Sequence, residues 1–440
     1  MRVTKTVFLY CLNSIPLMMN KKWKLICGSI ALVAVTAAAT YTVSYNIAMN
    51  RFNQVVAEVN ERQSMYSKLS DIDQTVRQNY SESIDEEKLR EGICKGYISG
   101  LSDTYARYLT ADQYKMYQLR QSGKALGIGV RTIIDQDGNM EVIAVSDNSP
   151  AQKAGVQKGD VIVSIDSEEV ETIGYETAAE KLYGESGTKV NLGIMRVIPE
   201  GAENAGLKQR VDVEATHGKY QEQVADWRIV GEKIGCIRIF AFTNQTPVSF
   251  DTAVSDLKAN GVENFIIDLR NCSKGDAEYA ASVLDRLVPE GTLVSAVDKS
   301  GTEQVLYTSD SNQFQYPLTV LTNQNTSGAA ELVASAIKDY QKGTVIGETT
   351  AGNGVKEQVY PLSDGSAVMI AVAHYLTPKS EIFTGIGIQP NTELVMPGEL
   401  RWKLDRLTLS DQEDNQLQAA ITALNPAVVE SQAIEQAPET

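Results

Sequence analysis

The sequence predicts a multidomain protein that combines α+β and α/β parts, and three changes of pattern along its 440 residues carry this prediction. An apolar stretch near the N-terminus leads into a region with helical periodicity. From residue 126 short β-rich runs are separated by glycine-containing turns. From residue 230 strands and helices alternate, which is typical of an α/β layer with crossover helices.

The chain of 440 residues is too long for one ordinary domain of roughly 150 residues. The patterns divide it into six segments. We expect a cytoplasmic N-terminus at 1–24, a transmembrane anchor or signal at 25–49, a helical linker or dimerisation region at 52–120, a β-rich domain at 121–199, an α/β core at 200–400, and a C-terminal helix with an acidic tail at 401–440.

The charge of the chain is uneven. The first 50 residues hold five of the 40 basic residues and no acidic one, which leaves 35 basic against 56 acidic residues beyond them. A body this acidic would be repelled by nucleic acid phosphates and by anionic lipid, so we expect no nucleic-acid partner. The five cysteines show neither a disulfide framework nor metal-ligand spacing, and we expect no metal or cofactor.

The segment from Leu25 to Met49 contains no charged residue, and as a helix it can cross a hydrocarbon core of about 30 Å. Lys21, Lys22 and Lys24 directly precede it, which favours a cytoplasmic N-terminus and an extracytoplasmic body, held in the cell membrane by one helix. The run at 37–39 is also compatible with signal-peptide cleavage, and a soluble core helix is the third interpretation.

The region after the apolar segment has the spacing of amphipathic helices. Leu69, Ile72, Val76 and Tyr80 recur every three or four residues, and Ser83 precedes acidic residues as a helix N-cap would. Such a region suits a linker or a dimerisation element, and a homodimer is therefore a candidate assembly.

The β-rich region contains a recurring order of signals. A glycine-rich strand, a turn, a second strand, a short Ser-Pro helix, a third strand, a longer helix and a last strand follow one another from Leu126 to Arg196. This order resembles a PDZ domain of the type found in bacterial proteases. The resemblance implies that Leu126, Gly127, Ile128 and Gly129 bind a peptide carboxylate and that the neighbouring strand edge accepts the peptide. A purely structural hairpin is the alternative.

Several segments of the α/β region belong to one recognisable pattern. They are Ile234 to Ile239, Asp268 to Asn271, Val320 to Ile337, Gly347 to Gly354, His374 to Pro378 and Gly385 to Pro390. Together they resemble the carboxyl-terminal processing (tail-specific) serine peptidases, and the resemblance spans roughly residues 54–425. It implies that family's fold and a serine-type peptidase ancestry.

The residues that such a peptidase needs differ in this chain. With Asn323 and Glu331 as fixed points, the nucleophilic serine of the family falls on Gly328, and its general-base lysine falls on Asn353. Glycine offers no nucleophile, and an amide takes no proton near neutral pH. The family's Gly-Gly oxyanion turn reads Lys274-Gly275 here. The resemblance therefore implies a member without an intact catalytic site.

A nearby pair could replace the lost one. Ser327 adjoins Gly328, and Lys356 follows Asn353 by three residues, so a shifted Ser327–Lys356 dyad is the active alternative. Against it, one step along a helix or strand turns a side chain to another face, and Ser327 has the position of a helix N-cap.

Three hypotheses follow for function. The first is an inactive, membrane-anchored scaffold or regulator that binds peptide or protein C-termini, with an active peptidase or another envelope protein as its partner. The second is an active endopeptidase with the shifted dyad. The third is a structural envelope protein with a silent peptide groove.

Overall fold

The computed structural model describes residues 21–121, 126–201, 204–310 and 314–425. The expected acidic tail beyond Asn425 and most of the expected cytoplasmic N-terminus lie outside these ranges. Contacts divide the chain into two units, residues 1–90 and 91–440, and each is described by itself.

The first unit is dominated by one long helix, α2 (Lys21–Asn79), in which the apolar stretch and the amphipathic region are continuous. Its segment Leu32–Asn50 is long and apolar enough to cross a membrane, with a mean hydropathy of 1.3 and no burial inside the protein. A signal sequence near an N-terminus meets the same criterion. This segment overlaps the predicted anchor or signal.

Helix α3 (Glu86–Ser99) begins two residues later than the sequence suggested. Asp85 caps it, because its carboxylate accepts hydrogen bonds from the backbone N–H groups of Glu87 and Lys88, each at 3.1 Å. Ser83 is therefore not the N-cap. Asp85 caps the helix in place of Ser83 because its carboxylate accepts from two free N–H donors of the first turn.

The rest of the region expected to be helical contains a strand as well. β1 (Arg107–Leu109) precedes α4 (Ala111–Gln121) and pairs with a strand of the C-terminal core. The segment therefore contributes to the second unit's fold instead of serving only as a linker.

The β-rich domain is built on one antiparallel sheet with the order β3-β4-β5-β8-β9. Its strands are β3 (Val130–Ile134), β4 (Met140–Val145), β5 (Val161–Ile165), β8 (Lys189–Val197) and β9 (Lys208–Thr216), and β6 (Glu168–Glu169) pairs with β5. Because β9 pairs with β8 over nine residues, the sheet continues past residue 199, where the sequence placed the boundary.

A two-stranded ribbon and three short helices complete this domain. β2 (Leu126–Gly127) pairs with β7 (Tyr183–Gly184) beside the main sheet. The helices are α5 (Pro150–Ala154), α6 (Val170–Ile173) and α7 (Tyr175–Lys181). Fully buried side chains such as Met140, Ile162 and Ile194 form its separate core.

The C-terminal core contains a six-stranded sheet with the order β10-β11-β12-β15-β16-β19, parallel except for the pair β10–β11. Its strands are β10 (Ala225–Val230), β11 (Ile234–Ile239), β12 (Asn264–Asp268), β15 (Leu318–Thr322), β16 (Thr344–Gly347) and β19 (Thr392–Glu393). Helices α8 (Thr246–Ala259), α9 (Ala277–Leu287) and α10 (Ala329–Asp339) pack on one face. Helix α12 (Asn415–Leu424) packs on the other.

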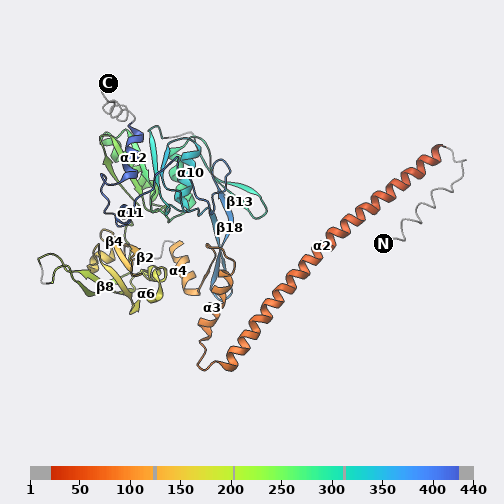
Figure 1. Ribbon diagram of the computed structural model, residues 1–440, viewed down its shortest axis with the longest axis horizontal. Helices are drawn as coiled ribbons and strands as arrows, with labels where there is room; N and C mark the ends of the chain where they lie inside the picture. Colours follow the sequence, from red (N-terminus) through yellow and green to blue (C-terminus); the bar gives the residue numbers. More distant parts are fainter. Residues whose placement is uncertain (1–20, 122–125, 202–203, 311–313, 426–440) are drawn as a thin grey trace, which may run out of the picture. The chain divides into compact units, whose positions relative to one another are not determined.

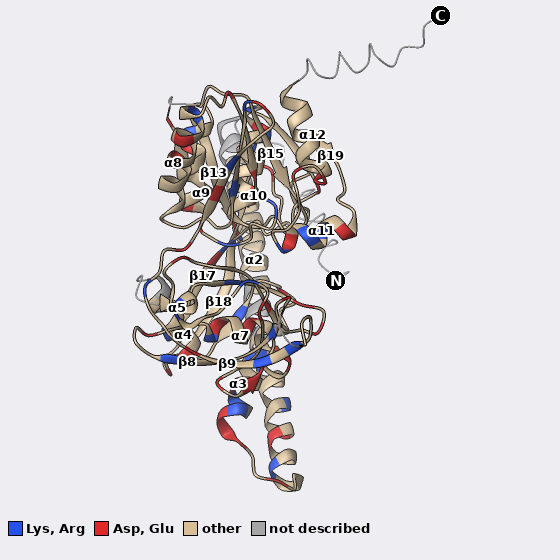
Figure 2. Cartoon of the chain, turned by 90° about the vertical axis from the view of Figure 1, so that its left-hand side faces the viewer, with Lys and Arg blue, Asp and Glu red and all other residues tan. Residues whose placement is uncertain are grey.

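A second sheet of the core joins β1 to β18 (Ala367–Leu376), β13 (Gly291–Asp298) and β14 (Glu303–Ser309), with β17 (Val355–Pro361) paired to β18. Helix α11 (Gly398–Asp405) lies between this fold and α12 in the sequence. Figure 1 shows the β-rich domain and the core as two lobes of the second unit. Acidic and basic residues are interspersed over both lobes (Figure 2). The predicted combination of an N-terminal apolar helix, a β-rich domain and an α/β core is confirmed.

Candidate functional site

The candidate site lies where three parallel strands of the core end. β12, β15 and β16 end at Asp268, Thr322 and Gly347, and the carboxyl ends of neighbouring parallel strands meet at one sheet edge. The loops that follow these ends carry the turn at 272–275, the segment before α10 and the loop at 350–353. This edge therefore brings together three segments that the sequence singled out.

Asparagine side chains fasten two of these loops to each other. The amide of Asn323 donates to Asn271 Oδ1 at 2.8 Å, and the backbone N–H of Asn271 donates to Asn323 Oδ1 at 3.0 Å. The N–H of Ser327 also donates to the carbonyl of Cys272 at 2.9 Å. The loop before α10 is thus held directly against the turn that contains Lys274.

Gly328 and Asn353 lie side by side at the start of α10. A Cβ atom built on Gly328 would have Asn353 Nδ2 at 3.8 Å as its nearest described neighbour outside the adjoining residues, so a small side chain would fit there. The backbone of Gly328, with φ 61° and ψ −117°, is in a region that side chains other than glycine rarely adopt. Both residues line a cavity of about 740 Å³.

One buried carboxylate, that of Glu331, connects the start of α10 to the loop at 350–353. Glu331 accepts hydrogen bonds from the N–H groups of Gly328 at 2.9 Å and Asn353 at 2.7 Å through Oε2. Its Oε1 accepts from the N–H of Gly352 at 2.7 Å and from the hydroxyl of Thr350 at 2.5 Å. Burial raises the pKa of Glu331, and these four donors oppose the rise. The sequence reasoning used this residue only to set the register.

The turn at Lys274 keeps an ordered backbone. The carbonyl of Lys274 accepts from the N–H of Phe242 at 2.9 Å, and its φ lies outside the left-handed region. Gly275 has φ 118°, and a Cβ there would come within 2.1 Å of the Phe242 carbonyl oxygen. The second position of the turn therefore requires glycine, whereas the first tolerates an exposed lysine.

Ser327 and Lys356 are not brought together. Ser327 lines a different cavity, of about 860 Å³. On β17 the alternate residues Val355, Glu357 and Val359 line the cavity beside Asn353, whereas Lys356, between them, lines neither cavity. No hydrogen bond joins the two side chains in the described part of the chain. Gly328, not Ser327, is the N-cap of α10, because the loop reaches helical geometry one residue later than the sequence suggested.

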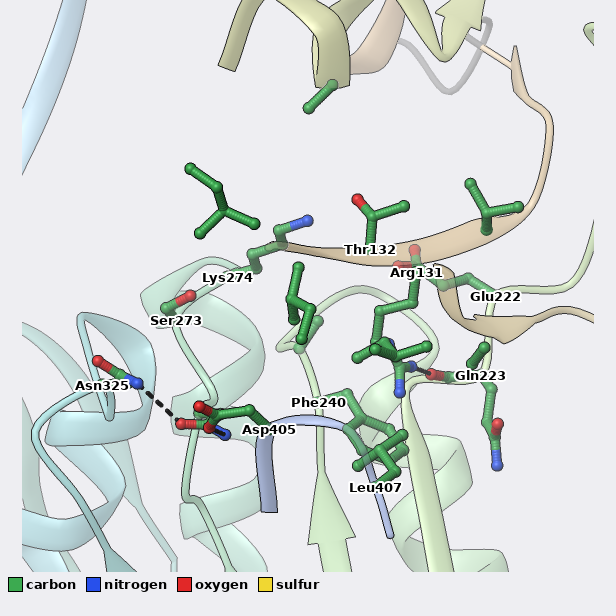
Figure 3. Close-up of a pocket in the computed structure, with 18 of the residues that line it drawn as sticks. Arg131, Thr132, Glu222, Gln223, Phe240, Ser273, Lys274, Asn325, Asp405 and Leu407 are labelled. Carbon is green, nitrogen blue, oxygen red and sulfur yellow. Dashed lines mark hydrogen bonds between the residues drawn. The ribbon is translucent and has the colours of Figure 1, made fainter. Parts of the chain in front are cut away.

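The larger cavity lies between the β-rich domain and the core, and Figure 3 shows residues from both around it. On the side of the β-rich domain it follows β3 and α7, and on the core side it reaches Phe240, Lys274 and Asn325. Arg107, Glu180 and Tyr183 line both cavities, so the two adjoin.

The segment Leu126 to Gly129 lies at one end of the larger cavity, but part of its backbone is already engaged. Leu126 and Gly127 pair with Tyr183 and Gly184 in the ribbon, and the N–H of Ile128 donates to Leu182 at 3.2 Å. Ile128 and Gly129 line the cavity. The Gly129 N–H donates to no acceptor among the described residues, which leaves it available to a carboxylate.

Two arginines connect the domain to the core around this cavity, and sequence reasoning identified neither. Arg131 of β3 donates to the carbonyl of Gln223 at 2.7 Å and stacks on the Phe240 ring at 3.7 Å. Arg406 forms an ion pair with Glu141 of β4 at 2.7 Å. Burial lowers the pKa of Arg131, and its Nη1 has no hydrogen-bond partner among the described residues. Such long-range contacts leave no periodic signal in the sequence.

A buried ion cluster supports the strand end below the site. Arg270 binds Asp268 and Asp414, each at 2.8 Å, and so ties β12 to the start of α12. Burial alone would raise the pKa of Asp268, but Arg238 and Arg270 hold it well below its ordinary value. The cluster therefore fixes the end of the strand that leads into the site.

Comparison with known proteins matches three parts of the chain to described families. Peptidase family S41 matches residues 233–394, a PDZ domain matches residues 141–196, and the N-terminal domain of the activating protease CtpB matches residues 26–113.

Similar proteins cover most of the chain. The carboxyl-terminal-processing protease of Synechocystis sp. is 29% identical over 332 residues, which are 75% of this chain and 76% of the relative. The carboxy-terminal processing protease CtpA of Bacillus subtilis is 29% identical over 335 residues, which are 76% of this chain and 70% of the relative. The solved structure of a photosystem II D1 C-terminal processing protease superimposes with a TM-score of 0.50 at 25% identity and covers 79% of this chain and 91% of that one.

Proposed function

Because this chain belongs to the family of carboxyl-terminal processing serine peptidases with a PDZ domain, we propose that it binds peptide C-termini without cleaving them. The observation that carries the proposal is the neighbourhood of Gly328. Apart from Gly328 and its chain neighbours, the amide nitrogen of Asn353 is the only described atom within 4 Å of a built Cβ. A serine peptidase of this kind needs a hydroxyl and a base within hydrogen-bond reach at such a place.

The surroundings of this position support binding over hydrolysis. The cavity beside Asn353 is lined by Glu357 and Tyr375, whose pKa values are both raised by burial, that of Tyr375 to about 12. Neither is a basic amine that could replace the missing lysine. Loss of one member of a catalytic pair costs on the order of 10⁴–10⁶ in rate.

The binding site that we propose is the groove between β3 and α7. Its end at Gly129 offers a free N–H donor, and its wall is apolar through Ile128, Val130 and Leu182. A peptide with a free carboxylate and an apolar last residue suits these groups. A carboxylate-terminated peptide should therefore bind much more tightly than its C-terminal amide, as measured by calorimetry. Equal affinities would contradict capture of the carboxylate.

The cellular setting that we propose is an extracytoplasmic body held by one helix in the cell membrane. The lysines at 21, 22 and 24 before the apolar segment support this orientation. Protease treatment of intact cells should remove the body beyond residue 51. Digestion only after lysis would overturn the orientation.

The role that we propose is that of a scaffold or regulator. A protein that retains C-termini without cleaving them can hold substrates for an active peptidase or for another envelope protein. The helices in the region 52–120 offer a surface for a homodimer. Cross-linking in membranes, followed by identification of the linked chains, tests both assemblies. Recovery of the monomer alone would count against both.

A further inference from the structure

The outer edge of β3 is not paired with another strand in the described part of the chain. β3 is the first strand of its sheet, and β4 is its one partner among the described strands. Thr132 lies opposite Val142, whose N–H and C=O bond to Asp160 and Gly159 on the far side, each at 2.8 Å. In an antiparallel pair, the backbone N–H and C=O groups of two opposite residues either bond to each other or both point away from the pair. The N–H and C=O of Thr132 therefore face the free edge.

A tyrosine already occupies this edge position. The hydroxyl of Tyr175, the first residue of α7, donates to the carbonyl of Thr132 at 2.8 Å. The same hydroxyl lies 2.9 Å from Thr132 Oγ1, which is then its donor. Both residues line the larger cavity, and Tyr175 is half-buried there. One side chain thus satisfies a backbone acceptor that strand addition would otherwise use.

The register of an added strand identifies which peptide residue would compete with it. The outward groups of β3 recur every second residue, at Val130 and Thr132. With the carboxylate at Gly129, the last peptide residue lies beside Val130, and the third residue from the end lies beside Thr132. Its backbone N–H would donate to the carbonyl that Tyr175 now holds.

From this arrangement, and resting on the proposed binding of peptide C-termini, we propose that Tyr175 is a displaceable substitute for the third-from-last residue of the bound peptide. The last two residues enter the groove without disturbing it. A longer peptide must release the hydroxyl of Tyr175 before its third residue can pair with Thr132. Tyr175 therefore limits affinity for extended C-termini and leaves capture of the carboxylate unaffected.

The test uses two peptides and two variants of the full chain in detergent. The peptides are an acetylated hexapeptide of five alanines and a C-terminal valine, and its truncated form acetyl-alanyl-valine, both with free carboxylates. Tyr175→Phe removes only the hydroxyl, and Tyr360→Phe is the matched control, since Tyr360 lies on β17, outside both cavities. Dissociation constants are measured by NMR titration, and thermal unfolding confirms that each variant is folded.

We expect Tyr175→Phe to bind the hexapeptide about three- to tenfold more tightly than the unmodified chain, because one competing hydrogen bond is removed. Binding of the truncated peptide should not change, and Tyr360→Phe should match the unmodified chain with both. If Tyr175→Phe binds the hexapeptide equally or more weakly, the proposed role of Tyr175 is overturned, but the proposed binding of peptide C-termini is not. Failure of every variant to bind either peptide overturns the proposed function and this inference with it.

Discussion

The buried carboxylate of Glu331 should be essential to the stability of the candidate site, and Glu331→Gln tests this. The substitution preserves size but replaces one acceptor oxygen by an NH₂ group. In the structure each oxygen receives two donors, Oε2 from Gly328 and Asn353 and Oε1 from Gly352 and Thr350. If the NH₂ group faces Gly328 and Asn353, both N–H donors lose their acceptor. If it faces Gly352 and Thr350, it can donate to the Thr350 hydroxyl oxygen, and only the Gly352 N–H loses its acceptor.

The magnitude follows from these contacts. A buried donor left without a partner costs about 1–3 kcal/mol, and the more favourable amide orientation leaves one such donor, the N–H of Gly352. Burial raises the pKa of Glu331, which means that its charge is itself costly in this place. Removing that charge offsets part of the loss. We therefore expect Glu331→Gln to lower the free energy of unfolding by about 1–2 kcal/mol.

Urea denaturation followed by tryptophan fluorescence measures this difference. Glu357→Gln is the matched control, because the Glu357 carboxylate forms only a long ion pair within the described residues, with Arg107 at 3.8 Å. An exposed ion pair of this kind contributes about 0–1 kcal/mol. If Glu331→Gln lowered the free energy of unfolding by less than about 1 kcal/mol, or by no more than the control does, the stabilising role of this carboxylate would be refuted.

Three further outcomes are expected. Burial alone would raise the pKa of Asp268, but its arginine partners lower it, so the ionised Asp268 stabilises the fold above about pH 4. The urea midpoint should therefore fall as the pH is lowered from about 4 to about 2. A constant midpoint would contradict the stabilising role of the cluster. Gly328→Ser should cost about 1–2 kcal/mol, because its φ is +61°, and should yield no peptidase activity; labelling of the new serine by a fluorophosphonate would argue against this. Truncation before Pro426 should leave the free energy of unfolding within about 0.5 kcal/mol, and loss of cooperative unfolding would show that the tail is needed.

Much of the fold could be predicted because its signals are local. Alternating apolar residues, glycine turns and continuous apolar strands such as Asn264–Asp268 each reflect the period of one element. The strand Lys208–Thr216 was not predicted, because it lies at the edge of its sheet and its apolar residues alternate with charged, exposed ones. An edge strand of this kind resembles a polar linker in the sequence.

The candidate site was only partly accessible to sequence reasoning. Gly328 and Asn353 could be singled out because each lies in a short segment with its own fixed register. The contact between Tyr175 and Thr132 could not, because it joins residues 43 positions apart across two elements. The ion pair of Arg406 with Glu141 depends likewise on how the β-rich domain meets the core. Such contacts are set by tertiary packing, which no local pattern encodes.

The most direct test of the central claim is a peptidase assay on the unmodified full chain. The hexapeptide sequence of five alanines and a C-terminal valine forms the end of a longer tagged polypeptide. This polypeptide is incubated with the protein and examined by mass spectrometry. The structure places no hydroxyl at Gly328 and no amine at Asn353, so we expect the polypeptide to be bound and recovered intact. Turnover that is abolished by Ser327→Ala would contradict the proposal and favour the shifted Ser327–Lys356 dyad.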